Sequence, residues 1–339
     1  MARVARVPPP ADRRHATRVL LGLLVPGLVL LAVGRPELIL YAVLGSFAGM
    51  YGRGERPAER LRHQLHGAGM LVTGVALGTT LAATGAGPGV LVGCVTAFAT
   101  LGSLVTDALR LRPGGPFFGI FALGATASVG ADLVSPLGAV LICAATAGWC
   151  LGLGIVGAAL VTTCSDLYPG VRAGHNTRVV VRTRSYKQAL RYALATATAG
   201  LTGLALGVEH ANWAMAAAAV PLAIVTAGDP IDLRAVVERA GHRIAGTFAG
   251  LAVTAVVLLP EPRPAVLALV VMALLFPTEL FLSRHHGVAL GFFTPLIMIM
   301  TELAAPTEPL GLLVARGADT LLGVAAGVAA AALVPGRER

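Results

Sequence analysis

Two stretches of the chain, TDALRLRPGGPFFG (residues 106–119) and TELFLSRHHGVALG (residues 278–291), carry a threonine, an acid, an arginine and two glycines at matching positions. They lie 172 residues apart, and the same offset places GHRIAGTFAG (241–250) over GMLVTGVALG (69–78), with three glycines aligned. A nearly constant offset over most of a half is the pattern of an internal repeat. The sequence therefore predicts a tandem duplication, a design that recurs in membrane transporters.

The composition of the chain is that of a membrane protein. Of its 339 residues 56% are hydrophobic and 13% are charged, and the mean hydropathy is +0.78, whereas about a quarter of the residues of a soluble domain are charged. Since a spanning helix needs about 20 apolar residues, the apolar stretches predict an all-α fold. We expect a polytopic transmembrane helical bundle of two tandem six-helix repeats, with about 12 helices. The predicted helices are 18–34, 37–51, 68–84, 87–107, 116–133, 137–160, 188–207, 211–228, 244–259, 264–282, 288–304 and 311–334.

The basic residues indicate how the bundle is oriented in the membrane. All of the 26 lysines and arginines except Arg35, Arg263 and Arg316 fall in the termini or in loops on one side of the predicted bundle. Because cytoplasmic loops carry the excess of Lys and Arg, both termini are predicted to be cytoplasmic, in a multi-pass protein of the plasma (bacterial inner) membrane. This topology explains the net charge of +9. No nucleic-acid partner is expected, because no soluble basic domain is predicted.

The repeat divides the chain into four predicted segments. Residues 1–16 form a basic, Pro-rich cytoplasmic tail, and residues 17–160 form the first six-helix membrane repeat. Residues 161–187 form a cytoplasmic linker, and residues 188–335 form the second repeat. The arginine-rich linker is expected to lie against anionic headgroups, so membrane lipid is an expected partner.

The sequence indicates neither a cofactor nor a metal site. The four cysteines have no CxxC spacing. The neighbouring His285 and His286 would point about 100° apart on a helix, which disfavours joint ligation of one ion. No GxxxxGK[ST] motif for a nucleotide occurs in the chain. We therefore expect no cofactor and no metal, and energy for any transport would not come from ATP bound by this chain.

Three stretches of the second half carry a recognisable pattern: HANWAMAAAAVPLA (210–223), RAVVERAGHRIAGTFAGLAV (234–253) and ARGADTLLGVAAG (315–327). They resemble the fusaric-acid-resistance and aromatic acid exporter membrane proteins. In that family a Trp opens one helix, an Arg-x-x-Gly-Thr-x-x-Gly motif starts another, and an Arg-x-x-Asp pair lies in the last. The matching residues here are Trp213, Arg243, Gly246, Thr247, Gly250, Arg316 and Asp319. The resemblance covers roughly residues 190–330 and implies export of small organic acids, aromatic ones among them.

Arg316 and Asp319 lie inside the last predicted helix, where a lone charge costs at least about 2.5–3.5 kcal/mol on insertion scales. At a spacing of i,i+3 the two side chains are expected to face each other and offset part of this cost. The corresponding positions of the first repeat, 143–147, carry no charge. Two interpretations stay open: a substrate or proton site that breaks the repeat, and a structural pair that holds the last helix.

Asp107 and Glu279 are equivalent acids at the predicted cytoplasmic ends of their helices. Each is followed five residues later by an arginine, Arg112 or Arg284. The two acids either cap and anchor these helix ends or form a symmetric cytoplasmic gate.

Three further residues are candidates for the substrate or proton pathway on the outer side. Glu302 ends an apolar helix there and is placed to line an exit. Trp213 and His210 lie near the outer interface, where a Trp commonly anchors a helix. Stacking on a substrate ring is the alternative role for Trp213.

The function expected from the sequence is that of a membrane transporter, a proton-coupled exporter of small organic acids. Arg316 would attract a carboxylate, and Asp319 or Glu302 would exchange protons. One alternative is an intramembrane enzyme acting on a lipid or prenyl substrate, but the acids Asp229 and Asp232 flank a proline and form a poor metal-diphosphate site. Another alternative is a non-transporting membrane assembly subunit. We expect no enzymatic activity, a small organic anion as partner, and leave homo-oligomerisation open.

Overall fold

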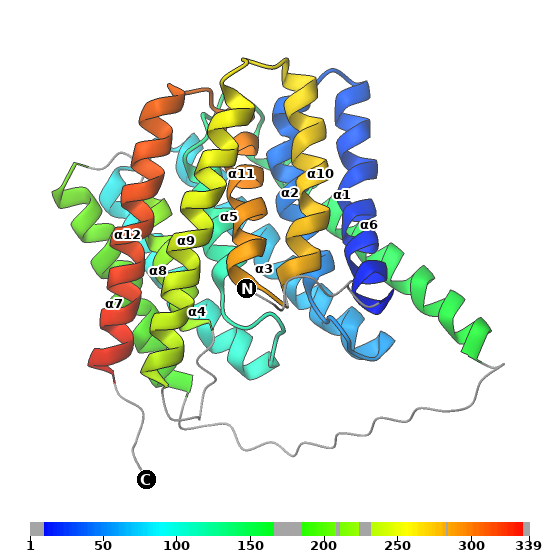
Figure 1. Cartoon of the computed structure of the whole chain (residues 1–339), viewed down its shortest axis with the longest axis horizontal. Helices are drawn as coiled ribbons and strands as arrows, with labels where there is room; N and C mark the ends of the chain where they lie inside the picture. The colour runs from blue at the N-terminus through cyan, green and yellow to red at the C-terminus, as the bar shows by residue number, and fades with distance from the viewer. Residues whose placement is uncertain (1–9, 166–184, 208–210, 224–231, 283, 335–339) are drawn as a thin grey trace, which may run out of the picture.

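The computed structural model describes residues 10–165, 185–207, 211–223, 232–282 and 284–334. Within these residues every regular element is a helix, and the helices pack into one bundle (Figure 1), which confirms the predicted all-α fold. Each of the predicted apolar stretches overlaps a helix. The elements are α1 (Pro10–Ala32), η1 (Pro36–Leu38), α2 (Ile39–Ser46), η2 (Phe47–Met50), α3 (Pro57–Ala83), α4 (Pro88–Leu109), α5 (Phe117–Ala127), α6 (Pro136–Ser165), α7 (Ser185–Ala205), α8 (Ala211–Leu222), α9 (Leu233–Leu258), α10 (Pro264–Leu282), α11 (His286–Ala304) and α12 (Pro309–Leu333).

The described part of the chain contains 8 helices that are long and apolar enough to cross a membrane: α1, α3, α4, α6, α9, α10, α11 and α12. The protein is therefore a multi-pass membrane protein. Three shorter apolar segments, Pro36–Met50, Phe117–Ala127 and Ala211–Leu222, are largely buried among the long helices. Short helices are tolerated there because neighbouring protein, and not lipid, surrounds their ends. The remaining helix, α7, has 21 residues but is less apolar.

The same pairs of helices are in contact in both halves. In the first half α3 packs against α5 and α6, and in the second half α9 packs against α11 and α12. The first helix of each half packs against a helix of the other half: α1 contacts α10, and α7 contacts α4. This pairing agrees with a pseudo-twofold arrangement of two repeats. The tandem duplication itself stays a prediction.

Glycines allow the closest of these contacts. Gly74 and Gly78 of α3 lie against backbone atoms of α5, and Gly246 and Gly250 of α9 lie against backbone atoms of α11. A Cβ atom at any of the four would meet the neighbouring helix closer than ordinary van der Waals contact. Small residues of this kind permit close helix approach in a membrane, where apolar side chains gain little by leaving lipid.

Two other glycine pairs at a spacing of four behave differently from each other. Gly323 and Gly327 of α12 lie against the backbone of α8, whereas Gly148 and Gly152 of α6 face open space. The spacing alone therefore does not show which helix faces are in contact, because so glycine-rich a chain contains such pairs on exposed faces as well.

The beginning of α9 differs from the prediction. The apolar stretch 244–259 placed the preceding basic residues in a loop. The helix begins instead at Leu233, and the Asp232 carboxylate caps it by accepting hydrogen bonds from two backbone N–H groups of its first turn. Arg239 and Arg243 are thus helical residues, and their side chains reach a cavity inside the protein.

Parts of the predicted domain organisation fall outside the described residues. Helix α6 continues to Ser165 and α7 begins at Ser185, so the predicted linker 161–187 is described only at its two ends. Of the predicted tail 1–16, residues from Pro10 onward belong to α1.

Candidate functional site

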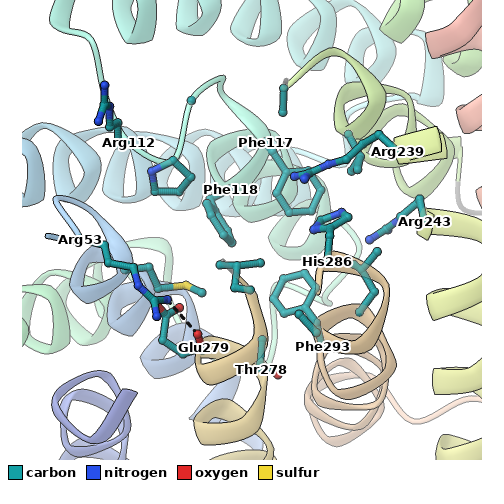
Figure 2. A pocket seen from close by; sticks show the side chains of 18 residues that line it. Arg53, Arg112, Phe117, Phe118, Arg239, Arg243, Thr278, Glu279, His286 and Phe293 are labelled. Atoms are coloured by element: carbon teal, nitrogen blue, oxygen red, sulfur yellow. Dashed lines mark hydrogen bonds and ion pairs between the residues drawn. The ribbon is translucent and has the colours of Figure 1, made fainter. Parts of the chain in front are cut away.

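A cavity of about 280 Å³ lies at the end of the bundle where α9 begins and α10 ends. Its wall is formed by the segment after η2, the loop before α5 and the first turn of α5, the end of α8, and parts of α9, α10 and α11 (Figure 2). We name it the aromatic cavity after Phe117, Phe118 and Phe293, which line it. Its volume is near the lower end of the range for small-molecule pockets, roughly 300–1,000 Å³, and suits a ligand with a single ring.

The three phenylalanines form a continuous aromatic wall. The ring centroids of Phe117 and Phe118 lie 5.2 Å apart, and the centroid of Phe293 lies 6.2 Å from each of them. Behind this wall, Phe121 lies 6.3 Å from Phe293 and 5.4 Å from Trp213. These separations are those of interacting aromatic pairs. The aromatic contacts therefore continue from the cavity toward the middle of the bundle.

One side of the aromatic cavity carries two arginines and a histidine with nitrogens that lack hydrogen-bond partners. Arg239 and Arg243 lie one turn apart on α9 and share a face of the helix. Arg243 is only 1% exposed, its Nε and Nη1 have no hydrogen-bond partner, and its Cζ lies 5.9 Å from the ring centroid of Phe117. The Nε of Arg239 and both ring nitrogens of His286 also lack partners. Since an unpaired buried charge is costly, an anion on this side would stabilise the buried guanidinium of Arg243.

The opposite side of the cavity holds a cation that the chain's own acids already neutralise. The Nη1 of Arg53 lies 3.2 Å from Oε1 of Glu279 and donates a hydrogen bond of 3.0 Å to the Glu279 carbonyl oxygen. Its Nη2 lies 3.0 Å from Oδ1 of Asp12. The Nε2 of His15 on α1 lies 2.8 Å from the same Glu279 oxygen. Glu279 is 1% exposed, so this cluster is a buried ionic contact between α1, α10 and the segment after η2.

Arg316 and Asp319 are both buried in α12, at 3% and 1% exposure, but the expected ion pair between them does not form. The guanidinium carbon of Arg316 lies instead 4.0 Å from the centroid of the Trp213 ring on α8, a cation–π contact. The Nε and Nη1 of Arg316 and both carboxylate oxygens of Asp319 have no hydrogen-bond partner. The spacing i,i+3 permits a pair, but here Arg316 turns toward α8.

A second cavity, of about 70 Å³, lies beside the connection from α11 to α12, at the opposite end of the bundle from the aromatic cavity. We name it the small cavity; Ser128, Trp213, Thr301 and Glu302 line it. Glu302 accepts hydrogen bonds of 3.0 Å from both the backbone N–H and the hydroxyl of Thr307. Glu302 therefore holds the loop after α11 as well as lining the cavity.

The structure distributes the predicted site residues over three places. Glu279 lines the aromatic cavity, and Glu302 lines the small cavity together with Trp213. Arg316 lies beside Trp213, with Asp319 one turn further along α12. These residues follow one another from one end of the bundle to the other, with Phe121 and Phe293 between the first place and the second.

Two predicted residues do not join this group. Asp107 on α4 is partly exposed and does not line either cavity. It lies 172 residues before Glu279, but unlike Glu279 it does not line the aromatic cavity. His210 lies outside the described residues.

Several residues of the aromatic cavity were not predicted as site residues, above all Arg239, Arg243 and the three phenylalanines. Arg243 stood in the Arg-x-x-Gly-Thr-x-x-Gly motif, which was the one available signal. Phe117 and Phe118 lie inside the repeated stretch 106–119, but two apolar residues in an apolar chain carry no signal of their own.

Comparison with protein families matches residues 194–330 to the family described as fusaric acid resistance protein-like. No curated protein and no solved structure matches the chain. The matched range begins within α7 and contains α8 to α11 and most of α12, including Arg243, Arg316 and Asp319. The resemblance seen in the sequence motifs is thus confirmed: residues 194–330 are similar to the fusaric acid resistance protein-like family.

Proposed function

We propose that this membrane protein is a transporter that exports small aromatic carboxylic acids. The observation that carries the proposal is the aromatic cavity, in which the buried, unpartnered guanidinium of Arg243 lies beside a wall of phenylalanine rings. The family match supports a transporter, because fusaric acid resistance proteins are efflux proteins.

The chemistry of the cavity suits both parts of such a substrate. A guanidinium presents two parallel N–H groups to a carboxylate and binds it in a bidentate manner, and Arg243 has two such nitrogens without partners. Arg239, one turn away, adds positive charge. The aromatic ring of the substrate would pack against Phe117 and Phe293, which lie 6.2 Å apart. Aromatic contacts of this kind are worth about 0.5–1.5 kcal/mol beyond their buried area.

A route out of the cavity is supported by the groups behind the aromatic wall. Phe121 and Trp213 connect this wall to the small cavity. Arg316 rests on the Trp213 ring, so an acid that moves along this route meets a second cation and a second aromatic surface together. The two cavities are separate, and passage therefore requires the helices to rearrange, as in alternating access.

Proton coupling is supported by the position of Asp319. Its carboxylate is buried in the same helix as Arg316 and accepts no hydrogen bond. As an anion Asp319 would attract Arg316, and as a neutral acid it would leave Arg316 to the carboxylate of the substrate. Binding of a proton and binding of the substrate would thus favour the same state of α12. Glu302, at the small cavity, would exchange the proton with the outer side.

The charge of the loops supports an orientation of the protein in the membrane. The aromatic cavity lies at the end of the bundle where Arg53, Arg112 and Arg239 gather. The excess of basic residues belongs on the cytoplasmic side. The substrate would therefore enter the aromatic cavity from the cytoplasm, with both termini on that side of a bacterial inner membrane.

The proposal is tested with the purified protein in liposomes loaded with labelled benzoate. We expect release of benzoate faster than from protein-free liposomes, and acceleration of this release when the pH differs across the membrane. Binding of benzoate without any release would favour a non-transporting assembly subunit. Neither binding nor release of benzoate, salicylate or 4-hydroxybenzoate would overturn the proposal.

A further inference from the structure

The aromatic cavity has two cationic sides that differ in one respect. Figure 2 shows Arg53 with Glu279 on one side and Arg239 with Arg243 on the other, with Phe117, Phe118 and Phe293 between them. A substrate ring packed on the phenylalanines would thus have a guanidinium group beyond each edge. By charge alone, such a cavity would suit a molecule with a carboxylate at both ends.

One of the two cationic sides is already occupied by a carboxylate of the chain. Arg53 contacts Glu279 at 3.2 Å and Asp12 at 3.0 Å, so two acids share its charge. Glu279 also receives His15 at 2.8 Å. The opposite guanidinium, Arg243, has no acid within ion-pair distance among the described residues, and two of its nitrogens lack partners. Of the guanidinium groups of Arg53 and Arg243, only that of Arg243 is free of a carboxylate among the described residues.

We infer that Glu279 makes the aromatic cavity selective for acids with a single carboxylate and excludes aromatic dicarboxylates. Glu279 occupies the place at Arg53 that a second substrate carboxylate would take. A dianion would bring that carboxylate against the buried Glu279 side chain, and like charges repel strongly where they are screened from water. Selectivity of this kind comes from an element that repels the wrong ligand. The inference rests on the proposed function, since it assigns a specificity to the same cavity.

The position of Glu279 distinguishes this role from that of a helix-end anchor. Asp107 occupies the equivalent position of the first repeat at the end of α4, yet it is partly exposed and lines neither cavity. An anchor needs only the helix end. Glu279 instead lies inside the cavity wall at 1% exposure, in contact with Arg53 of another segment.

The first measurement uses the unmodified protein, so that it does not depend on any variant folding. Binding of benzoate, terephthalate and the monomethyl ester of terephthalate is compared by calorimetry on the protein in detergent. The ester is larger than terephthalate but carries one charge. We expect the affinity for the ester to be within about threefold of that for benzoate. The affinity for terephthalate should be about tenfold or more below that for benzoate. Equal binding of terephthalate and its ester would overturn the inference.

The second measurement uses Glu279→Gln, which keeps the size of the side chain and removes its charge. We expect the ratio of terephthalate to benzoate affinity to rise about tenfold, because the charge that repels the second carboxylate is removed and Arg53 keeps only Asp12 as an acidic partner. The double variant Arg53→Gln/Glu279→Gln should lose this gain, and Asp107→Asn should leave the ratio at the wild-type value. An unchanged ratio in Glu279→Gln would overturn the inference even though benzoate still binds. Failure of benzoate to bind the wild-type protein would instead overturn the proposed function.

Discussion

The two halves of the chain share their helix contacts and differ in their buried charges. Gly74 of α3 and Gly246 of α9 occupy equivalent places and bring equivalent helices together. Arg243, three residues before Gly246, is buried beside the aromatic cavity, whereas the position 172 residues earlier is Leu71, an apolar core residue. Arg316 and Asp319 likewise correspond to an uncharged part of α6, residues 143–147.

The difference in buried charges indicates that the two halves have different roles. Contacts that both halves make are those that build the bundle, and a change in either half should have a similar effect on stability. Buried charges are costly in a membrane protein. Four of those in the second half, Arg243, Glu279, Arg316 and Asp319, lie along the cavities and the aromatic residues between them. The second half, which also carries the family match, should therefore contain the residues on which transport depends.

The largest effect is expected from Arg316→Ala and Asp319→Asn. Each should abolish benzoate release from liposomes, because each removes a buried charge on the route between the cavities, while benzoate still binds the aromatic cavity and the protein is made in near-normal amounts. Release and abundance are measured together. If each single variant depletes the protein and the double neutral variant restores it, the two residues form a structural pair and the difference between the halves has no bearing on transport.

Arg243→Gln should weaken benzoate binding by about 30-fold or more, the usual range for loss of one partner of a buried charge pair. Arg234→Gln is the matched control, because Arg234 lies on the same helix but is exposed and away from the cavity. Its affinity for benzoate should equal that of the wild type. Calorimetry on the two purified variants measures their affinity for benzoate. An equal loss of affinity in Arg243→Gln and Arg234→Gln would show that Arg243 does not bind the carboxylate.

The shared contacts of the two halves are tested by Gly74→Val and Gly246→Val. Both should destabilise the protein to a similar extent, about 1–3 kcal/mol, because the added atoms would overlap the backbone of the neighbouring helix. Gly148→Val should have little effect, since the space beside Gly148 is open. Thermal unfolding in detergent measures all three. If only one of Gly74→Val and Gly246→Val destabilised the protein, the helix contacts of the two halves would not be equivalent.

Phe293→Leu should weaken benzoate binding by about 2- to 10-fold, the worth of an aromatic contact, and should affect cyclohexanecarboxylate less. The control is Phe98→Leu on α4, which lies outside the aromatic cavity. An equal loss for the aromatic and the saturated acid would show that Phe293 supplies bulk and no ring contact.

The smallest effect is expected from Asp107→Asn. Asp107 is a partly exposed acid whose contribution should not exceed about 1 kcal/mol, so benzoate release should stay within about twofold of wild type over a range of pH. Glu279→Gln should reduce release more, because Glu279 lines the cavity and contacts Arg53. Equal release by both variants would remove these two acids from the mechanism of benzoate transport.

The fold was largely predictable because helices in a membrane obey local rules. Apolar stretches of sufficient length must be helical to satisfy their backbone groups, and each predicted stretch overlaps a helix. The predicted start of α9 was wrong because basic residues that precede an apolar stretch are typical of a loop. Arg239 and Arg243 are instead accommodated by a helix that begins earlier and by a cavity that other segments complete.

The candidate site was predicted only in part, for a related reason. The charge of Arg316 and Asp319 within an apolar helix identified them as unusual, and both are buried. Their geometry was not predictable from spacing, because Arg316 pairs with Trp213 of α8 and not with Asp319. Likewise Glu279 and Asp107 look alike in the sequence and differ only in what faces them.

The sequence by itself determined that this protein is a helical membrane protein, that its halves carry a common pattern, and that its second half resembles fusaric acid resistance proteins, because length, hydropathy and motif spacing are properties of the chain alone. Only the tertiary structure decided which charges have partners. Arg53 contacts Glu279 across 226 positions of sequence. Arg243 forms no ion pair with an acid among the described residues and faces phenylalanines from α5 and α11. Whether a buried charge is neutralised or left for a ligand depends on neighbours that arrive from distant parts of the chain, and packing alone brings them together.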